Sequence, residues 1–253
     1  MGATGSDDGR GATMSPRRQR DRPARLTLLG RFAVFEGDDE VHLAEMPQRI
    51  VALLALHGRP MRRELVAASL WPETDNAASR LRTNLYRLRR ASDRLVVPGE
   101  GNLRLADTVA VDHARAVDLG RRLAESDRPA TVGELDPAVF EHPLLPGWYD
   151  DWLEHDREAY EQLRFGALEG IARRCIDAAR TDRAVWACLL VIRAEPYRES
   201  AHRLLAEAHA AAGNPIEALR QLDRYVDLVE REMSAGPSRL MIDLREGLRS
   251  ALR

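Results

Sequence analysis

An arginine-rich helical segment without acidic residues constrains this chain more than any other feature. Residues 76–91 contain five arginines and no Asp or Glu, although the whole chain has a net charge of −2. Surface helices usually mix the two signs, because opposite charges four residues apart stabilise the helix. The segment predicts a helix with one face in a core and the other free for an anionic partner. The core face is expected to hold Ala78, Leu81, Leu85 and Leu88, which recur at helical spacing.

The opposite face of this helix would present guanidinium groups beside short polar side chains. Arginine binds phosphates and guanine edges, and threonine and asparagine make contacts of shorter reach. These properties favour a helix that enters the major groove of double-stranded DNA, and the plainer interpretation is a solvated arginine-rich surface. The expected DNA-facing residues are Arg80, Arg82, Thr83, Asn84, Tyr86, Arg87 and Arg90, with Asn84 at the edge of the face and Arg82 nearer the buried side.

The segments around this helix predict a small domain of strands and helices. Short apolar runs bounded by Gly, Asp and Pro indicate strands and a hairpin, and Pro47 suits the first turn of a helix. Strands, three helices and a hairpin in this order form a winged helix, whose third helix enters the major groove. We expect strands at 25–36 and 40–43, helices at 48–56, 62–70 and 76–91, and hairpin strands at 95–97 and 103–105.

The C-terminal half shows an internal repeat with a period of 34 residues, the period of tetratricopeptide repeats. The repeat pairs Ile171 with Leu205, Ala172 with Ala206, Ala184 with Ala218, and Cys188 with Leu222. We expect helices at 156–180, 183–194, 198–212 and 215–233, and a capping helix at 237–252. Such helical arrays usually bind protein and seldom carry catalytic chemistry.

Together these patterns predict a mainly α protein with small β elements. An N-terminal winged helix-turn-helix would be followed by an all-α tetratricopeptide-like domain. Residues 1–24 contain almost no apolar side chains and are expected to be a disordered tail. The domains expected after it are the winged helix at 25–108, a linker helix and connector at 109–145, and the helical domain at 146–253.

The sequence lacks the motifs of common enzyme and metal sites. It has no Gly-rich phosphate-binding loop, no His-Glu-x-x-His, no Gly-x-Ser-x-Gly and no cysteine pair at zinc spacing. His202 and His209 could share a helical face but have no third ligand, and Cys175 and Cys188 are expected as buried free thiols. We therefore predict no enzyme activity, no metal and no cofactor. Without a membrane-spanning apolar run or a signal peptide, the expected location is cytoplasmic.

In this order, the elements resemble those of the Streptomyces antibiotic regulatory protein (SARP) family of transcriptional activators. Residues 70–72 (Leu-Trp-Pro) and 87–89 (Arg-Leu-Arg) lie where response-regulator-type winged helices carry the loop before the recognition helix and the end of that helix. Residues 145–152 (Leu-Pro-Gly-Trp-Tyr-Asp-Asp-Trp) and the Arg-Glu pair at 157–158 resemble the family's entry into its bacterial transcriptional activator domain. The resemblance spans about 26–253.

The resemblance implies partners beyond DNA. The loop before the recognition helix touches RNA polymerase in some response-regulator proteins, so Trp71 and Glu73 are candidate polymerase contacts, although Trp71 would equally suit the core. The helical domain is implicated in dimer formation in the family, which implies a homodimer. Many members carry an aromatic residue in the wing that this chain lacks. Arg104 is nevertheless a candidate for a phosphate or minor-groove contact, and the alternative is that Glu100 or solvent holds it.

We interpret the chain as a sequence-specific DNA-binding activator that binds repeated promoter sites and recruits RNA polymerase. The alternative from another class is a protein-binding helical-repeat scaffold whose winged helix does not bind DNA. Regulation by a small ligand through the helical domain is a third hypothesis that the sequence leaves open.

Overall fold

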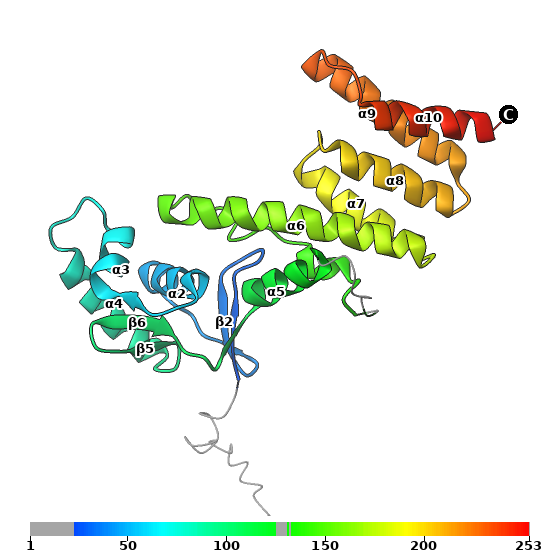
Figure 1. The fold of residues 1–253 in the computed structure, drawn as a ribbon. Coiled ribbons are helices and arrows are strands. Elements are labelled where there is room, and N and C mark those ends of the chain that lie inside the picture. Colours follow the sequence, from blue (N-terminus) through cyan, green and yellow to red (C-terminus); the bar gives the residue numbers. More distant parts are fainter. Residues whose placement is uncertain (1–22, 125–130, 132, 253) are drawn as a thin grey trace, which may run out of the picture. The chain divides into compact units, whose positions relative to one another are not determined.

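The computed structural model describes residues 23–124, 131 and 133–252 (Figure 1). The disordered tail expected at 1–24 therefore lies outside the described residues, except for its last two positions. Contacts divide the chain into two units. Among the described residues, the first unit contains those up to Leu26 together with Ala33–Ala110, and the second contains Thr27–Phe32 and those from Val111 onwards.

The first unit is a winged helix, as predicted. It contains three helices and a three-stranded sheet of order β4-β6-β5, and the strand order of a second sheet is β3-β2-β1-β7. The elements are β1 (Ala24–Thr27), β2 (Ala33–Glu36), β3 (Asp39–Glu40), α2 (Glu45–His57), β4 (Met61–Arg62), α3 (Arg63–Leu70), α4 (Ala77–Ala91), β5 (Val96–Pro98), β6 (Asn102–Leu105) and β7 (Val109–Val111).

Apolar faces of α2 and α4 form the core beneath the wing. Ile50 and Leu54 of α2 and Leu88 of α4 are almost completely buried, as is Leu103 of β6. Residues three and four apart share one side of a helix, so the leucine spacing in α4 places its apolar face against this core. The predicted helix at 76–91 is thereby confirmed, although Ala78 in its first turn is exposed rather than buried.

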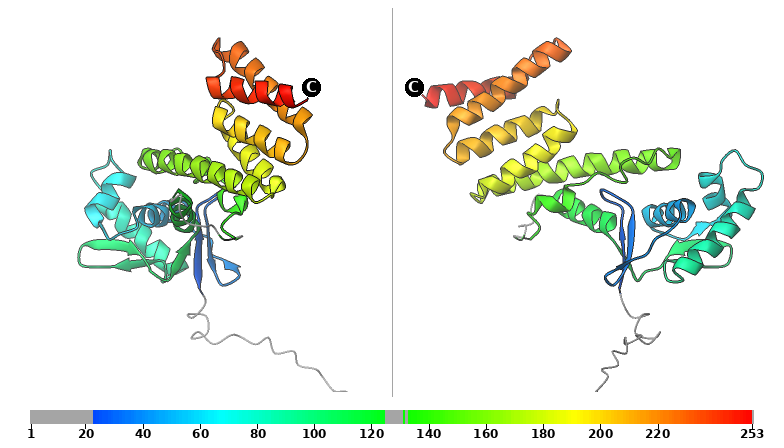
Figure 2. Two further views of the ribbon diagram at one scale, coloured as in Figure 1. Left: turned by 45° about the vertical axis from the view of Figure 1, so that its right-hand side comes forward. Right: turned by 180° about the vertical axis from the view of Figure 1, so that it is seen from behind.

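The described part of the second unit is mainly helical, with irregular segments at 27–32 and 133–150 that share one isolated β-bridge, Leu29 with Leu144. Helices α7 to α10 follow one another as a stack that begins against α6, which both views of Figure 2 show. The helices are α5 (Asp112–Ala124), η1 (Pro137–Phe140, a 3-10 turn), α6 (Asp151–Asp177), α7 (Thr181–Ala194), α8 (Glu199–Ala211), α9 (Pro215–Met233) and α10 (Arg239–Ala251).

The 34-residue repeat corresponds to two helix pairs, α6 with α7 and α8 with α9. Each of the four residue pairs identified in the sequence is buried at both positions, with Ala184 and Ala218 at 0% exposure. Alanine at these positions allows the paired helices to approach closely. Helix α6 begins five residues before the predicted start, because Asp151 and Glu154 occupy its first turn, where acidic side chains stabilise the helix dipole.

The segment Thr27–Phe32 interrupts the strand predicted at 25–36 and belongs to the second unit. Gly30 has φ of +80°, a conformation that glycine adopts at little cost, and its N–H donates to the carbonyl of Pro143 at 2.9 Å. The N–H of Leu145 donates to the carbonyl of Leu28, also at 2.9 Å. The predicted strand is therefore split into β1 and β2, and the segment between them pairs with residues more than 100 positions away.

Candidate nucleic-acid interface

Helices α3 and α4 form the helix-turn-helix, and α4 presents a strongly basic surface. Its buried side chains are Leu81, Asn84, Leu85 and Leu88. The first turn of α4 contains no acidic residue, and its last turn contains Arg89 and Arg90. The helix is thus held in the core along one side and leaves its guanidinium groups outside.

The five α4 arginines have no partner for their guanidinium groups within the described part of the chain. All five (Arg80, Arg82, Arg87, Arg89 and Arg90) are exposed. Arginines elsewhere commonly pair with a carboxylate, as Arg49 does with Glu45 at 2.8 Å and Arg245 with Asp223 at 2.6 Å. An unpaired row of like charges on one helix is unfavourable in isolation, so an anion that binds there gains from all of them.

The structure corrects one predicted contact and supports the exposure of two others. Asn84 is only 8% exposed and its side-chain amide donates to the carbonyl of Arg80, so it braces the helix instead of facing DNA. Thr83 is exposed; its hydroxyl donates to the carbonyl of Ser79 and keeps its lone pairs available as acceptors. Tyr86 is 63% exposed beside the arginines.

A pocket of about 210 Å³ lies along the side of α4 that faces the wing. Three guanidinium-bearing side chains line it, Arg63 from the start of α3 and Arg82 and Arg89 from α4. No sequence pattern indicates that Arg63 lies here, because its proximity to α4 arises only from the packing of α3 against that helix. The remaining lining residues are Leu85, Tyr86, Leu88, Ser92, Val96 and Leu103.

The wing places Arg104 on β6, opposite Val97 of β5. Its guanidinium group donates to Asp107 at 2.6 Å and not to Glu100, which was the partner considered from the sequence. The Asp107 side chain is largely exposed, so the pair is a surface interaction of small stability. Arg104 is therefore held loosely, and its contact with DNA stays a prediction.

The two candidate polymerase contacts in the loop between α3 and α4 differ in their exposure to solvent. Trp71 is 9% exposed and ends α3, with its backbone N–H bonded to the carbonyl of Ala67. It is a core residue, the second of the two roles considered for it. Glu73 is exposed on the same loop and is accessible to a partner.

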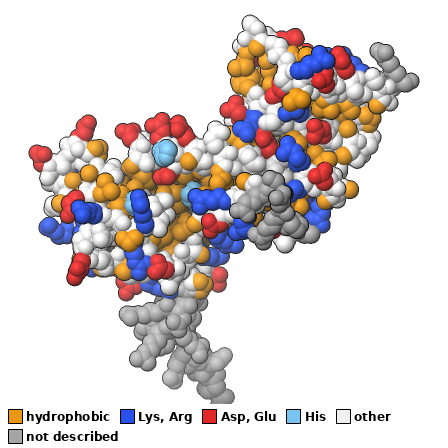
Figure 3. Space-filling model, viewed as in Figure 1, with side chains coloured by type: hydrophobic (Ala, Val, Ile, Leu, Met, Phe, Trp, Pro, Cys, Tyr) orange, Lys and Arg blue, Asp and Glu red, His pale blue; other side chains and the backbone are white. Residues whose placement is uncertain are grey.

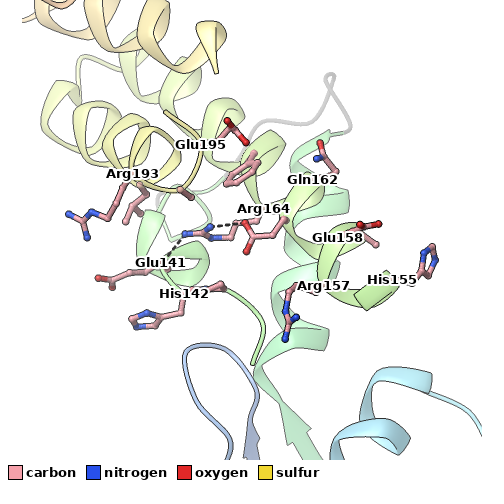
Figure 4. A pocket seen from close by; sticks show the side chains of 15 residues that line it. Glu141, His142, His155, Arg157, Glu158, Gln162, Arg164, Arg193 and Glu195 are labelled. Carbon is pink, nitrogen blue, oxygen red and sulfur yellow. Dashed lines mark hydrogen bonds and ion pairs between the residues drawn. The ribbon is translucent and has the colours of Figure 1, made fainter. Parts of the chain in front are cut away.

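A hollow of about 960 Å³ in the second unit is lined by residues of α6, the end of α7 and the segment after η1 (Figure 4). Its most buried charged group is Arg164, which donates to the carbonyls of Phe140 and Glu141 and to the Glu161 carboxylate. Arg157 likewise donates to backbone carbonyls, including that of Leu145. These two arginines fasten the segment after η1 to α6, and the lining of the hollow includes no Ser, Thr or Cys.

Two histidines of the second unit, His113 and His202, are packing residues. The buried His202 ring bonds to the carbonyl of Pro196 at 2.9 Å and to the Gln221 amide at 2.7 Å, so neither ring nitrogen is free for a metal. Burial lowers the pKa of His113 to about 4, and its ring lies 5.1 Å from that of Tyr160. The described residues contain no group of His, Cys, Asp or Glu arranged to hold a metal ion. Cys175 and Cys188 are buried free thiols, as predicted.

The surface of the helical array differs from that of α4. Basic and acidic side chains lie interspersed over it, on the face shown in Figure 3. Ion pairs such as Arg198 with Glu169 and Arg224 with Glu217 account for part of this mixture. None of the helices in the described ranges is both long and apolar enough to span a bilayer.

A winged helix with an unpaired basic helix, combined with a tetratricopeptide-like array, defines a class of transcription regulators. Residues 109–249 match the family model of the bacterial transcriptional activator domain. The match covers more than half of the chain, which therefore belongs to this family and is a transcriptional regulator of the SARP type. The family consists of regulators and not of enzymes.

A solved structure shows the same fold. The structure of Mycobacterium tuberculosis EmbR in complex with a low affinity phosphopeptide is 17% identical in sequence and has a TM-score of 0.71. The similarity covers 91% of this chain and 66% of the EmbR chain, so this chain spans slightly less than two thirds of that protein. No curated protein matches the sequence.

Proposed function

We propose that this regulator binds specific DNA sequences through α4 and activates transcription at promoters that carry repeated sites. The observation that carries the proposal is the set of five exposed α4 arginines whose guanidinium groups have no partner among the described residues. Unpaired guanidinium groups on a helix fixed in a winged-helix core fit phosphate oxygens and guanine edges in the major groove.

The central face of α4 would read the bases. Arg80, Thr83, Arg87 and Arg90 lie on the side of the helix opposite the buried leucines, with Tyr86 beside them. Arg82 and Arg89 lie on the side facing the wing, where they suit the sugar-phosphate backbone better than the base edges. Arg104 would join the backbone contacts after it leaves Asp107.

The second unit would supply the activating contacts. Trp186 and Leu189, one turn apart on α7, are 39% and 45% exposed, and exposed apolar side chains of this size favour a protein partner. RNA polymerase and a second copy of the chain are the partners that we propose for this unit and for the α3–α4 loop. The same exposure is also the observation that favours the alternative function, a protein-binding scaffold with an inactive winged helix.

Selection of genomic fragments at two salt concentrations tests the proposal. Purified full-length protein should recover a repeated motif, and its affinity should fall steeply as the salt concentration rises, because each phosphate contact releases counterions. The spacing of the motif would reveal how many copies bind. Recovery of no sequence above background would reject DNA recognition and favour the scaffold.

The substitution Arg87→Ala tests whether this side of α4 contacts the bases. Loss of a bidentate arginine–guanine contact costs about 1–3 kcal/mol of discrimination at one base pair. The variant should therefore relax the preference at one position of each site. Arg115→Ala is the matched control, because Arg115 is also an exposed arginine and lies on α5 in the second unit. An unchanged preference in Arg87→Ala would remove that residue from the reading face.

A further inference from the structure

The pocket between α4 and the wing has two layers of different chemistry. Its rim carries Arg63, Arg82 and Arg89, and its lining includes no carboxylate. Its floor is apolar, because Leu88 and Leu103 are 1% exposed and belong to the winged-helix core. Such a combination of an apolar enclosure with a few polar groups is typical of small-molecule sites.

The charges around the pocket favour an anion. The guanidinium groups of all three rim arginines have no partner within the described ranges. The carboxylate behind the pocket is that of Glu36, which accepts a hydrogen bond from the Ser92 hydroxyl and lies 3.9 Å from the guanidinium group of Arg94. The rim therefore keeps three positive charges that pair with no acid in the described part of the chain, in partly apolar surroundings where a charge pair is stronger than in water.

A phosphate group of DNA does not fill this space. It would meet the arginines at the rim and leave the leucine floor uncovered. The volume of about 210 Å³ equals that of about seven water molecules at ~30 Å³ each, which suits a compound of one or two rings. Tyr86, at the mouth, can stack on such a ring.

We propose that this pocket binds a small organic anion, one acidic group attached to an aromatic or alicyclic body, and that the anion competes with DNA. The acidic group pairs with Arg82 and Arg89, and the body packs on Leu88 and Leu103. Since the same arginines contact the DNA backbone in the proposed function, an occupied pocket lowers the affinity for DNA. The competition rests on that proposed function, whereas the pocket itself does not.

Equilibrium dialysis of the full-length protein tests the site with three probes: salicylate, 2-naphthoate and phenyl phosphate. At least one should bind saturably with a stoichiometry of one. The neutral 2-naphthalenemethanol should bind at least tenfold more weakly than 2-naphthoate, because it lacks the charge. Inorganic phosphate should also bind at least tenfold more weakly, because it lacks the apolar body. Failure of all three probes to bind, or equal binding of 2-naphthoate and its alcohol, would overturn the proposal.

Variants assign the binding to this pocket. The double substitution of Arg82→Gln and Arg89→Gln should weaken binding at least tenfold, and both side chains are exposed, so the fold should tolerate it. Arg62→Gln is the matched control: Arg62 is exposed, adjacent to Arg63 and outside the pocket lining. Unchanged binding in the double variant would place the anion elsewhere and contradict the proposal.

DNA competition separates this inference from the proposed function. A saturating probe should raise the Kd for a selected DNA site at least fivefold in the wild type and leave the Kd of the double variant unchanged. If the double variant loses DNA affinity and no probe binds the wild type, the arginines serve DNA alone and the small-ligand site is rejected. If a probe binds and no DNA sequence is ever selected, the pocket stands and the proposed function fails.

Discussion

The carboxylate of Asp112 accepts a hydrogen bond from the backbone N–H of Leu28 at 2.8 Å, across 84 positions of sequence. It also accepts from the N–H of Leu29 at 3.1 Å and from that of His113 at 2.7 Å. Burial raises the pKa of Asp112 even though these amide donors act in the opposite direction. One side chain at the start of α5 thus fixes the early segment Thr27–Phe32 to the second unit.

Replacement of Asp112 by Ala should destabilise the second unit. The change leaves backbone N–H groups without an acceptor, and an unsatisfied buried donor costs about 1–3 kcal/mol. We expect the loss of these hydrogen bonds together to lower the free energy of unfolding, measured in urea, by about 2–4 kcal/mol. Asp118→Ala, at an exposed position of the same helix, should change it by less than about 0.5 kcal/mol. Equal effects of the two substitutions would show that these hydrogen bonds do not hold the segment.

Stability should fall on acidification because of His113. Its pKa is about 4 in the folded chain and 6.5 ordinarily, so the unfolded chain binds a proton that the folded chain does not. The contribution is fully present above pH 6.5 and is lost as the pH falls from 6.5 towards 4, by about 2 kcal/mol at pH 5. Urea unfolding at pH 7.5 and pH 5 measures it. His113→Phe should reduce the pH dependence and the exposed His155→Gln should not; a full dependence in His113→Phe would contradict the assignment.

Two helical glycines should respond in opposite directions to alanine. A Cβ atom at Gly120 in α5 would lie 2.5 Å from Cδ2 of Leu163, whereas a Cβ atom at Gly247 in α10 would meet nothing within 4 Å. Gly247→Ala should therefore stabilise its helix by about 0.5–1 kcal/mol. Gly120→Ala should lose this gain to overpacking, for a net cost of about 1 kcal/mol. Thermal unfolding of both variants measures the contrast, and stabilisation by Gly120→Ala would disprove the close approach of α5 and α6.

Release of Arg104 from its ion pair should strengthen DNA binding. An exposed pair is worth about 0.2–1 kcal/mol, and Asp107→Asn also removes a negative charge near the phosphates. We expect Asp107→Asn to raise the affinity for a selected site about two- to fivefold, and Arg104→Gln to lower the slope of log K against log salt by about 1. The exposed Asp38→Asn in the same unit is the control. Unchanged affinity in both wing variants would remove the wing from the interface.

Glu73→Ala should separate activation from DNA binding. Glu73 is exposed on the α3–α4 loop, so its removal leaves the core intact. Transcription from a target promoter should fall in a reconstituted assay while the Kd for DNA stays constant. Trp71→Ala cannot serve this purpose, because loss of a buried tryptophan costs about 3–5 kcal/mol and would unfold the domain. Normal transcription with Glu73→Ala would exclude this side chain as a polymerase contact.

Sequence periodicity predicted those helices whose buried faces follow from the spacing of residues within one segment. The leucine spacing of α4 and the 34-residue pairing of Ala184 with Ala218 both place side chains correctly on buried faces. The error at Ala78 has a simple cause: the first turn of α4 extends beyond the core that receives Leu81. Asn84 was expected at the edge of the DNA-facing side. It lies instead among the buried leucines of the helix, where its side-chain amide donates a hydrogen bond to the carbonyl of Arg80.

Features that depend on tertiary neighbours could not be predicted from the sequence. Arg63 approaches Arg82 and Arg89 only after α3 packs against α4, and the pairing of Arg104 with Asp107 depends on how the wing strand ends. The separation of Thr27–Phe32 from its own strand is likewise invisible, because no spacing rule links Leu28 to Leu145. The arginine excess of α4, by contrast, was evident from composition alone.

The split first strand has a consequence for the order in which the chain acquires its structure during translation. Leu28 is synthesised early, but its partners at Asp112 and Leu145 leave the ribosome only after the whole winged helix has emerged. The second unit therefore cannot form all of its contacts before the residues of the first unit have been synthesised. A truncation that starts at residue 109, where the family match begins, would also lack the six-residue segment that this unit needs. A fragment that starts at residue 109 should be poorly soluble, and its solubility should recover when residues 27–32 are added as a separate peptide.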